Sequence, residues 1–135
     1  PRHLPGSLLD HAQVETSIIC DGCIIKNASI SNSIIGIRSI VAEGSRIKST
    51  LMMGADFYEG EGYYPDLTNA QTPPIGVGPG CSIEKAIIDK NARLGAGVII
   101  RPKDPADNHD GEGYAVRDGI TIIQKNAVIP EGTVI

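Results

Sequence analysis

The chain has 135 residues and a formal net charge of −4, with 12 basic and 16 acidic residues. This length fits one domain or part of one, and the scattered charges offer no basic face to a nucleic acid or an anionic membrane. Hydrophobic residues make up 41% of the chain but aromatic residues only 4%, with Ile the commonest residue. We therefore expect an aliphatic, β-branched core, which favours strands over helices.

The N-terminus and the apolar runs of the chain give a first indication of the protein's cellular location. No apolar run approaches the roughly 18 to 20 residues of a membrane span. The N-terminus lacks the charged region followed by an apolar region that marks a signal peptide, so we expect a cytoplasmic protein. The chain opens with Pro1-Arg2-His3-Leu4-Pro5 and no initiator Met, which predicts a fragment of a larger protein.

A short pattern recurs along the first half of the chain: one apolar residue, two variable residues, a small residue and two apolar residues. It occupies residues 14–19, 30–35 and 47–52, with starts 16 and 17 residues apart. Within these intervals, apolar markers at 14, 19, 25, 30, 35, 41 and 47 divide each turn into three. Three short sides per turn predict a triangular solenoid of short strands.

The same pattern continues at residues 83–100 and 123–135. We interpret the apolar markers as inward side chains, each stacked on its equivalent one turn away. The residue near each corner should then be small, and the residues assigned to that position are Ser17, Cys23, Ser29, Ser39, Ser45, Ala86, Ala92, Ala127 and Thr133. Tight corners are expected at Gly22, Gly44, Gly95, Gly97 and Gly132. Because an end turn exposes its core and strand edges, another domain or subunit should cover one end.

Two stretches interrupt the repeat. Residues 57–76 lack apolar markers, carry three of the four Tyr and are rich in Gly and Pro. Residues 101–119 are polar and end in Tyr114-Ala115-Val116-Arg117. Both are predicted to be loops inserted in the coil, where solenoids often carry contacts, although a surface excursion without a function fits equally well.

The cysteines do not form a metal-binding pattern. Cys20 and Cys23 have C-x-x-C spacing, but there is no second pair and Cys81 stands alone, so a zinc site lacks ligands. No helix N-terminus is predicted that would activate a thiol. We interpret the three as structural thiols, with Cys23 as a small inward residue.

The three histidines, His3, His11 and His109, lie in separate segments. An acyltransferase built on this kind of coil needs a histidine near a corner or between subunits, and His11 could be one. A surface position in the first turn is the favoured interpretation. We therefore predict no catalytic residue and no metal ligand in this chain.

Three stretches carry a resemblance to a known family: residues 53–58 (MGADFY), 87–95 (IIDKNARLG) and 119–127 (GITIIQKNA). They look like the C-terminal domain of glucose-1-phosphate adenylyltransferase, the ADP-glucose pyrophosphorylase of glycogen and starch synthesis. The opening residues 1–5 are similar to that family's interdomain linker. The resemblance spans essentially the whole chain and implies an all-β, left-handed parallel β-helix, with residues 1–135 as one domain and the catalytic nucleotidyltransferase domain upstream.

The resemblance also implies a function, namely the regulation and oligomerisation of an enzyme that joins ATP and glucose 1-phosphate to give ADP-glucose and pyrophosphate. ATP and Mg²⁺ would bind the parent's catalytic domain, and no cofactor is expected here. The implied partners are that catalytic domain, sister subunits in a tetramer and a phosphorylated metabolite effector. The implied location is the cytoplasm, or the plastid in a plant.

The candidate site residues are lysines at outward, variable positions of the repeat. Lys90 and Lys125 could anchor a phosphate as mobile point charges, although the residues alone favour ordinary solvated lysines. In activator-responsive members of the family, lysines at these two matching positions bind a phosphorylated glycolytic intermediate beside the catalytic domain. Arg93, Lys103 and Arg117 are weaker candidates.

Two departures from the family pattern bear on this site. Asp118 stands where the family usually has Ser, and Pro105 follows Lys103-Asp104 where Asn is common. An additional carboxylate beside the lysines would weaken anion binding.

A second class of function stays open: a free-standing hexapeptide-repeat acyltransferase, usually trimeric, with a histidine base and coenzyme A lying along the coil. A nucleotidyltransferase domain encoded upstream of Pro1 would separate the two hypotheses. The three matching stretches favour the adenylyltransferase domain.

Overall fold

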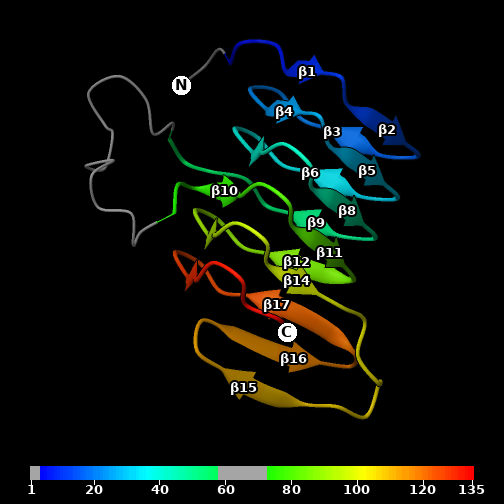
Figure 1. The fold of residues 1–135 in the computed structure, drawn as a ribbon, viewed down its shortest axis with the longest axis vertical. Helices are drawn as coiled ribbons and strands as arrows, with labels where there is room; N and C mark the ends of the chain where they lie inside the picture. Colours follow the sequence, from blue (N-terminus) through cyan, green and yellow to red (C-terminus); the bar gives the residue numbers. More distant parts are fainter. Residues whose placement is uncertain (1–3, 58–72) are drawn as a thin grey trace.

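The computed structural model describes residues 4–57 and 73–135, and every regular element within them is a β-strand. The strands stack into a coil of successive turns (Figure 1). No helix in these two ranges could span a membrane. Each turn contributes strands to three sheets, here named sheets A, B and C, and equivalent strands of successive turns pair in parallel.

The strands are short, and from β1 to β14 successive strands along the chain belong to sheets A, B and C in turn. Sheet A contains β1 (Leu8–Asp10), β4 (Ile24–Lys26), β7 (Ile40–Val41), β10 (Gly76–Val77), β13 (Arg93–Leu94) and β18 (Val128–Ile129). Sheet B contains β2 (Gln13–Glu15), β5 (Ser29–Ser31), β8 (Arg46–Lys48), β11 (Ser82–Glu84) and β14 (Ile99–Ile100). Sheet C contains β3 (Ile18–Ile19), β6 (Ile34–Ile35), β9 (Leu51–Met52), β12 (Ala86–Ile88), β15 (His109–Gly111), β16 (Tyr114–Arg117) and β17 (Ile120–Ile123).

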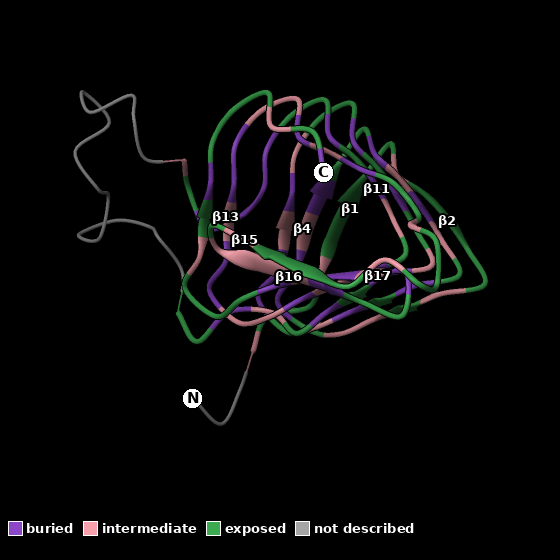
Figure 2. Cartoon of the chain, turned by 90° about the horizontal axis from the view of Figure 1, so that it is seen from below, coloured by how far each residue is buried: buried purple, intermediate pink, exposed green. Residues whose placement is uncertain are grey.

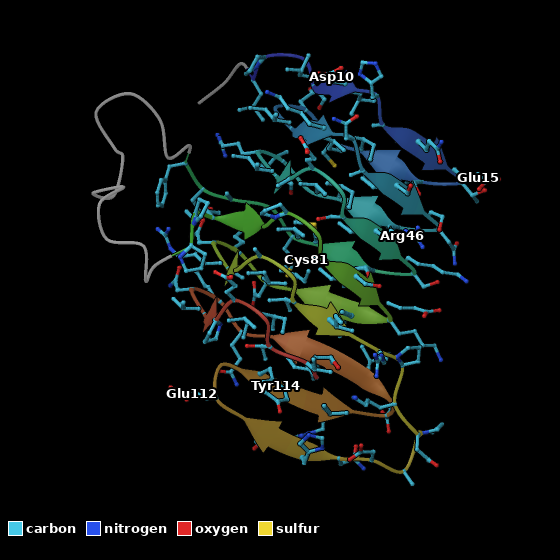
Figure 3. All side chains as sticks on the ribbon, viewed as in Figure 1. Asp10, Glu15, Arg46, Cys81, Glu112 and Tyr114 are labelled. Atoms are coloured by element: carbon cyan, nitrogen blue, oxygen red, sulfur yellow. The ribbon has the colours of Figure 1, made fainter. Side chains whose placement is uncertain are left out.

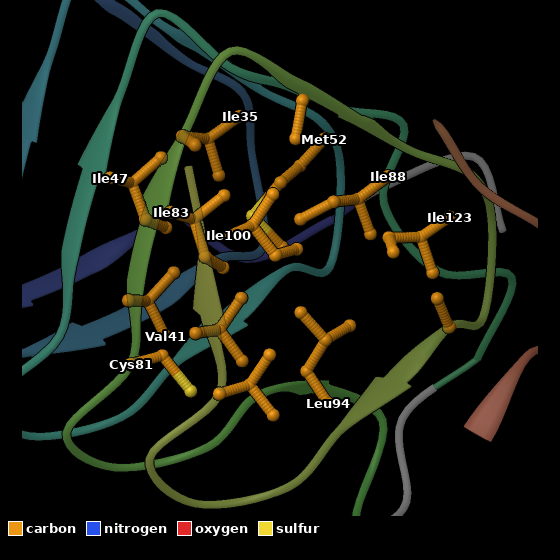
Figure 4. Close-up of a cluster of buried hydrophobic side chains, with 14 of the residues drawn as sticks. Ile35, Val41, Ile47, Met52, Cys81, Ile83, Ile88, Leu94, Ile100 and Ile123 are labelled. Carbon is orange, nitrogen blue, oxygen red and sulfur yellow. The ribbon is translucent and has the colours of Figure 1, made fainter. Parts of the chain in front are cut away.

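The predicted apolar markers form the core. Three stacks of side chains, one from each sheet, meet inside the coil (Figure 4). From sheet C come Ile35, Met52, Ile88 and Ile123; from sheet B come Ile47, Ile83 and Ile100; from sheet A come Val41, Val77 and Leu94. All of these are at most 3% exposed, so the inward positions of the repeat are confirmed in these turns.

The small residues near the corners hydrogen-bond along the coil. The Ser33 hydroxyl donates to the carbonyl of Ser31 and accepts from the backbone N–H of Thr50 in the next turn, and Ser17 does the same one turn earlier. One assignment was wrong: Ser29 is a strand residue beside Ile30, and buried Ala28 takes the small position. The assignment of the repeat was shifted by one residue at that turn.

The three edges of the coil are named by the sheets that they join. The AB edge comprises residues 11–12, 27–28, 42–45, 78–81, 95–98 and 130–133, and the CA edge comprises residues 20–23, 36–39, 53–56, 89–92 and 124–127. The BC edge comprises residues 16–17, 32–33, 49–50 and 85 together with residues 101–108 and 118–119 of the second insertion. Corners at the edges hold a residue with positive φ, such as Gly97 at 70°. Gly95 is required for another reason, because a Cβ there would lie 2.6 Å from the backbone N of Glu131.

The second insertion differs from the predicted loop. Residues 109–111 and 114–117 form an antiparallel pair, β15 and β16, and β16 pairs antiparallel with β17. The hairpin therefore continues sheet C beyond the last turn, at the bottom of Figure 1. Its Val116 is fully buried and Tyr114 packs against the core. Residues 58–72 of the first predicted insertion lie outside the described residues, and the chain re-enters sheet A at Gly76.

The two ends of the coil are covered differently. Viewed from below, β15 and β16 lie in front of the stacked turns (Figure 2), and Ile129 and Ile135 of the last turn are buried. In the first turn the inward residues Leu9 and Val14 remain 47% and 38% exposed. The described residues therefore leave the first turn open.

Candidate functional site

Lys90 and Lys125 occupy equivalent places on adjacent turns of the CA edge. Ile88 pairs with Ile123 on one side of the corner, and the backbone N–H of Asn126 donates to the carbonyl of Lys90 at 3.0 Å. Adjacent parallel strands lie about 4.8 Å apart, so the two lysines start from backbone positions at about that spacing. Residues 35 positions apart in the sequence thus form one pair of cations.

The corner itself explains why lysine can occupy this place. The following residues, Asn91 and Asn126, have φ of 60° and 61°, a conformation that Asn tolerates through its short polar side chain. The Asp89 carboxylate accepts a hydrogen bond from the backbone N–H of Lys90 at 2.7 Å. The turn at Lys90 is therefore supported by Asn91 and Asp89 rather than by the lysine side chain.

A carboxylate from the preceding turn lies against this pair. Asp56 Oδ1 is 3.2 Å from Lys90 Nζ, and Asp56 Oδ2 accepts a hydrogen bond from Asn91 Nδ2 at 3.0 Å. The backbone N–H of Asp56 donates to Asn91 Oδ1 at 2.9 Å, so Asp56 and Asn91 are joined twice. Buried Arg38 donates to the carbonyl of Ala55 at 3.1 Å, which holds the segment that carries Asp56.

The electrostatics of Asp56 agree with this geometry. The hydrogen bond from Asn91 and then the one from Lys90 lower the pKa of the Asp56 carboxyl. The charges of Lys90 and Lys125 lower it further. Both lysines therefore act on one carboxylate, although the pair between Lys90 and Asp56 is open to water, with side chains 42% and 47% exposed.

The weaker candidates divide between two edges. Arg93 begins β13 just beyond the CA edge and donates to the carbonyl of Pro73 at 3.0 Å. Arg117 lies at the BC end of sheet C, where it pairs with Ile120 and forms an ion pair with Asp110 at 2.7 Å. The backbone of Lys103 is hydrogen-bonded to Gly119 at that same end. Since β17 separates the two edges by about 10 Å of strand, Arg117 and the Lys103 backbone lie away from the lysine pair.

Asp118, the carboxylate expected to weaken anion binding, does not lie beside the lysine pair. Asp118 follows Arg117 at the BC edge, and its backbone N–H donates to Asn108. Pro105 lies near Gly119 at the same edge. Among the residues that the structure describes, the carboxylates beside Lys90 are instead Asp56 and Asp89. The contact from Asp56 was missed because it crosses 34 residues, although aligning residues 51–56 with 87–92 as successive turns would have indicated it.

The cysteines and the described histidines take no part in this corner. Cys23 and Cys81 are buried, and their thiols donate to the carbonyls of Gly36 and Gly95 at 3.1 Å. Burial raises the pKa of both thiols, and the inward position of Cys23 is confirmed. His11 is exposed and lies 2.6 Å from Asp10. His3 lies outside the described residues. Within residues 4–57 and 73–135, no group of three His, Cys, Asp or Glu could hold a metal ion.

Comparison with known proteins agrees with the architecture. Residues 2–134 match the family described as the GLGC left-handed parallel beta-helix domain. The chain is 44% identical over 137 residues to the glucose-1-phosphate adenylyltransferase small subunit, chloroplastic/amyloplastic, of Triticum aestivum. That match covers all of this chain but only 29% of the relative, and it favours the adenylyltransferase hypothesis over the acyltransferase. The chain belongs to the GLGC left-handed parallel β-helix domain family.

Proposed function

We propose that this chain is the regulatory and assembly domain of an ADP-glucose pyrophosphorylase, and that the CA edge around Lys90 and Lys125 binds the phosphoryl group of an effector. The observation that carries this proposal is the placement of two lysines at equivalent corners of adjacent turns, both acting on one carboxylate. The relative from wheat, a glucose-1-phosphate adenylyltransferase small subunit, supports the enzyme class.

The chemistry of the pair suits a phosphoryl group. Each lysine ammonium has three N–H donors, and a phosphoryl dianion has three acceptor oxygens. Two cations that start from backbone positions about 4.8 Å apart can donate to different oxygens of one phosphoryl group. The Lys90 side chain is 42% exposed, so an effector can reach it without unfolding the corner.

The parent reaction is assigned from the relative. The parent would join ATP and glucose 1-phosphate into ADP-glucose and pyrophosphate, with ATP and Mg²⁺ bound by a separate catalytic domain. An effector at the CA edge could change that activity only if it bound the active arrangement of the two domains more tightly than the inactive one. The site would therefore be shared between this domain and the catalytic domain.

Exposed aliphatic surface supports the assembly role. The outward residues Ile18, Ile34 and Leu51 lie in register across sheet C and are 60%, 45% and 37% exposed. Strands β2, β5, β8 and β11 of sheet B carry polar residues at their outward positions, and Glu15 and Arg46 project from the outer side of the coil (Figure 3). We assign the open first turn and the sheet C stripe to contacts with the catalytic domain or a sister subunit, because such surfaces lower their free energy when covered.

The proposed cellular location of the parent protein rests on the same relative. The wheat protein is chloroplastic or amyloplastic, and a plant parent of this chain would be in the plastid. A parent from another source would be cytoplasmic.

The test uses the full-length enzyme that contains this domain. Activation by 3-phosphoglycerate and by fructose bisphosphate is titrated in the wild type, Lys90→Ala and Lys125→Ala. Loss of one charge-assisted contact, about 1.5 to 3 kcal/mol, should raise the half-saturating concentration by one to two decades. Lys26→Ala, an exposed lysine beside the AB edge, is the matched control and should leave it unchanged. The site assignment fails if both site variants respond as the wild type does.

A second measurement concerns the enzyme class. The 135-residue chain alone should show no turnover with ATP, Mg²⁺ and glucose 1-phosphate, because the proposed catalytic groups belong to the parent's other domain. Turnover above a mock preparation would contradict that division of labour.

A further inference from the structure

Asp56 is held in one place by its own corner. One carboxylate oxygen accepts from Asn91 Nδ2 at 3.0 Å, and the backbone N–H of Asp56 donates to Asn91 Oδ1 at 2.9 Å. Asn91 is only 9% exposed and its positive φ fixes it in the turn. The other carboxylate oxygen is 3.2 Å from Lys90 Nζ. The negative charge thus stays beside Lys90 because Asn91, and not the lysine, anchors it.

We propose that Asp56 is a fixed counter-charge that lowers the affinity of Lys90 and Lys125 for phosphoryl groups. The inference rests on the proposed function and adds a residue that sets the affinity of the site. An incoming phosphoryl group would share the Lys90 ammonium with this carboxylate and would meet its negative charge at short range. Because the hydrogen bond from Asn91 Nδ2 restrains the carboxylate and the backbone hydrogen bond to Asn91 Oδ1 restrains the residue that carries it, Asp56 stays beside Lys90 and the repulsion persists on binding.

Asp56 could in principle help by orienting Lys90. The contact is a single one at 3.2 Å between side chains that are 42% and 47% exposed, and such pairs restrain a lysine weakly. The repulsion acts on the whole charge of the phosphoryl group, whereas the orientation involves one flexible side chain. Removing the charge of Asp56 should therefore strengthen anion binding.

The experiment is a calorimetric titration of the full-length protein with inorganic phosphate at low ionic strength. The variants are Asp56→Asn, Lys90→Ala and the double variant. Asp56→Asn keeps the size of the side chain and an oxygen that can accept from Asn91. We expect Asp56→Asn to lower the dissociation constant about three- to tenfold, with a smaller gain in high salt. The gain should be reduced in the Lys90→Ala background, where the shared ammonium is gone.

Glu131→Gln is the matched control, since Glu131 is an exposed carboxylate at the AB edge and its loss changes the net charge equally. An equal gain in Glu131→Gln would overturn the inference, because the effect would then come from net charge alone. If Asp56→Asn binds phosphate as the wild type does while Lys90→Ala binds it more weakly, the counter-charge is refuted and the lysine site stands. If neither Lys90→Ala nor Asp56→Asn changes binding, the counter-charge and the proposed site fail together.

Discussion

The AB edge and the CA edge are built from the same backbone turn but carry different side chains. Both place a residue with positive φ at the corner: Gly44, Gly80, Gly97 and Gly132 in successive turns of the AB edge, and Asn91 and Asn126 in the last turns of the CA edge. The residue before it is Glu43, Pro79, Ala96 or Glu131 at the AB edge and Lys90 or Lys125 at the CA edge. The turn thus constrains only one position, and the neighbouring position is available for chemistry.

The largest effect should come from breaking the core that both edges share. Ile88 is 3% exposed and leads into the CA edge. Ile88→Asp would bury an unpaired charge between two other turns and should cost more than about 4 kcal/mol, a large part of a domain's stability. Thermal melting followed by circular dichroism checks this.

Ile87→Asp is the control for that variant, because Ile87 is the outward, partly exposed neighbour in the same strand. It should remain folded. A soluble Ile88→Asp variant with an unchanged melting curve would show that residue 88 does not face the core.

The second-largest effect is expected at two glycines of the AB edge, one required by close packing and the other by its backbone conformation. A Cβ at Gly95 would lie 2.6 Å from the backbone N and 2.8 Å from the Cα of Glu131, whereas a Cβ at Gly97 would meet nothing within 4 Å. Gly95→Ala should therefore cost about 1 to 3 kcal/mol by forcing two turns apart. Gly97→Ala should cost about 1 to 2 kcal/mol from its positive φ alone. Chemical denaturation of the two variants measures both, and a Gly95→Ala variant as stable as the wild type would contradict the contact.

The parts of the structure that follow the repeat could be predicted from the sequence, and the parts that depart from it could not. The stacked core was readable because one β-branched residue must return inward at each side of the coil, as Ile83, Ile88 and Leu94 do. The hairpin of β15 and β16 was missed because it leaves that period, although Glu112-Gly113 between short strands is a turn signal. The proximity of Lys90 and Lys125 followed from the repeat. The contact from Asp56 did not, because the interrupted turn hid its register.

A smaller effect distinguishes the two asparagines of the CA edge. Gly tolerates the positive φ of either residue, so Asn91→Gly and Asn126→Gly should preserve the turn. Only Asn91 is joined to Asp56, by two hydrogen bonds. Asn91→Gly should therefore be less stable than Asn126→Gly by about 1 kcal/mol, measured by denaturation. Equal stabilities would mean that the two hydrogen bonds between Asn91 and Asp56 contribute nothing to the free energy of unfolding.

The smallest effect is the pH dependence of the Asp56 contact. The pKa of Asp56 is lowered in the folded protein from its ordinary value of 3.8. The charged form is therefore favoured by folding, and its contribution is present above pH 3.8 and lost as the pH falls through the lowered pKa. The melting-temperature difference between wild type and Asp56→Asn should be constant near neutral pH and should shrink in acid. A difference that grows in acid would contradict the sign.

The most direct test of the central claim asks whether Lys90 and Lys125 bind one phosphoryl group together. In the full-length enzyme, activation by 3-phosphoglycerate is titrated in the wild type, Lys90→Ala, Lys125→Ala and the double variant. If the two ammonium groups share one ligand, each single variant should weaken activation strongly, and the second substitution should add less than the first. Strictly additive losses would indicate two independent contacts, and unchanged half-saturation in all three variants would contradict the effector site at the CA edge.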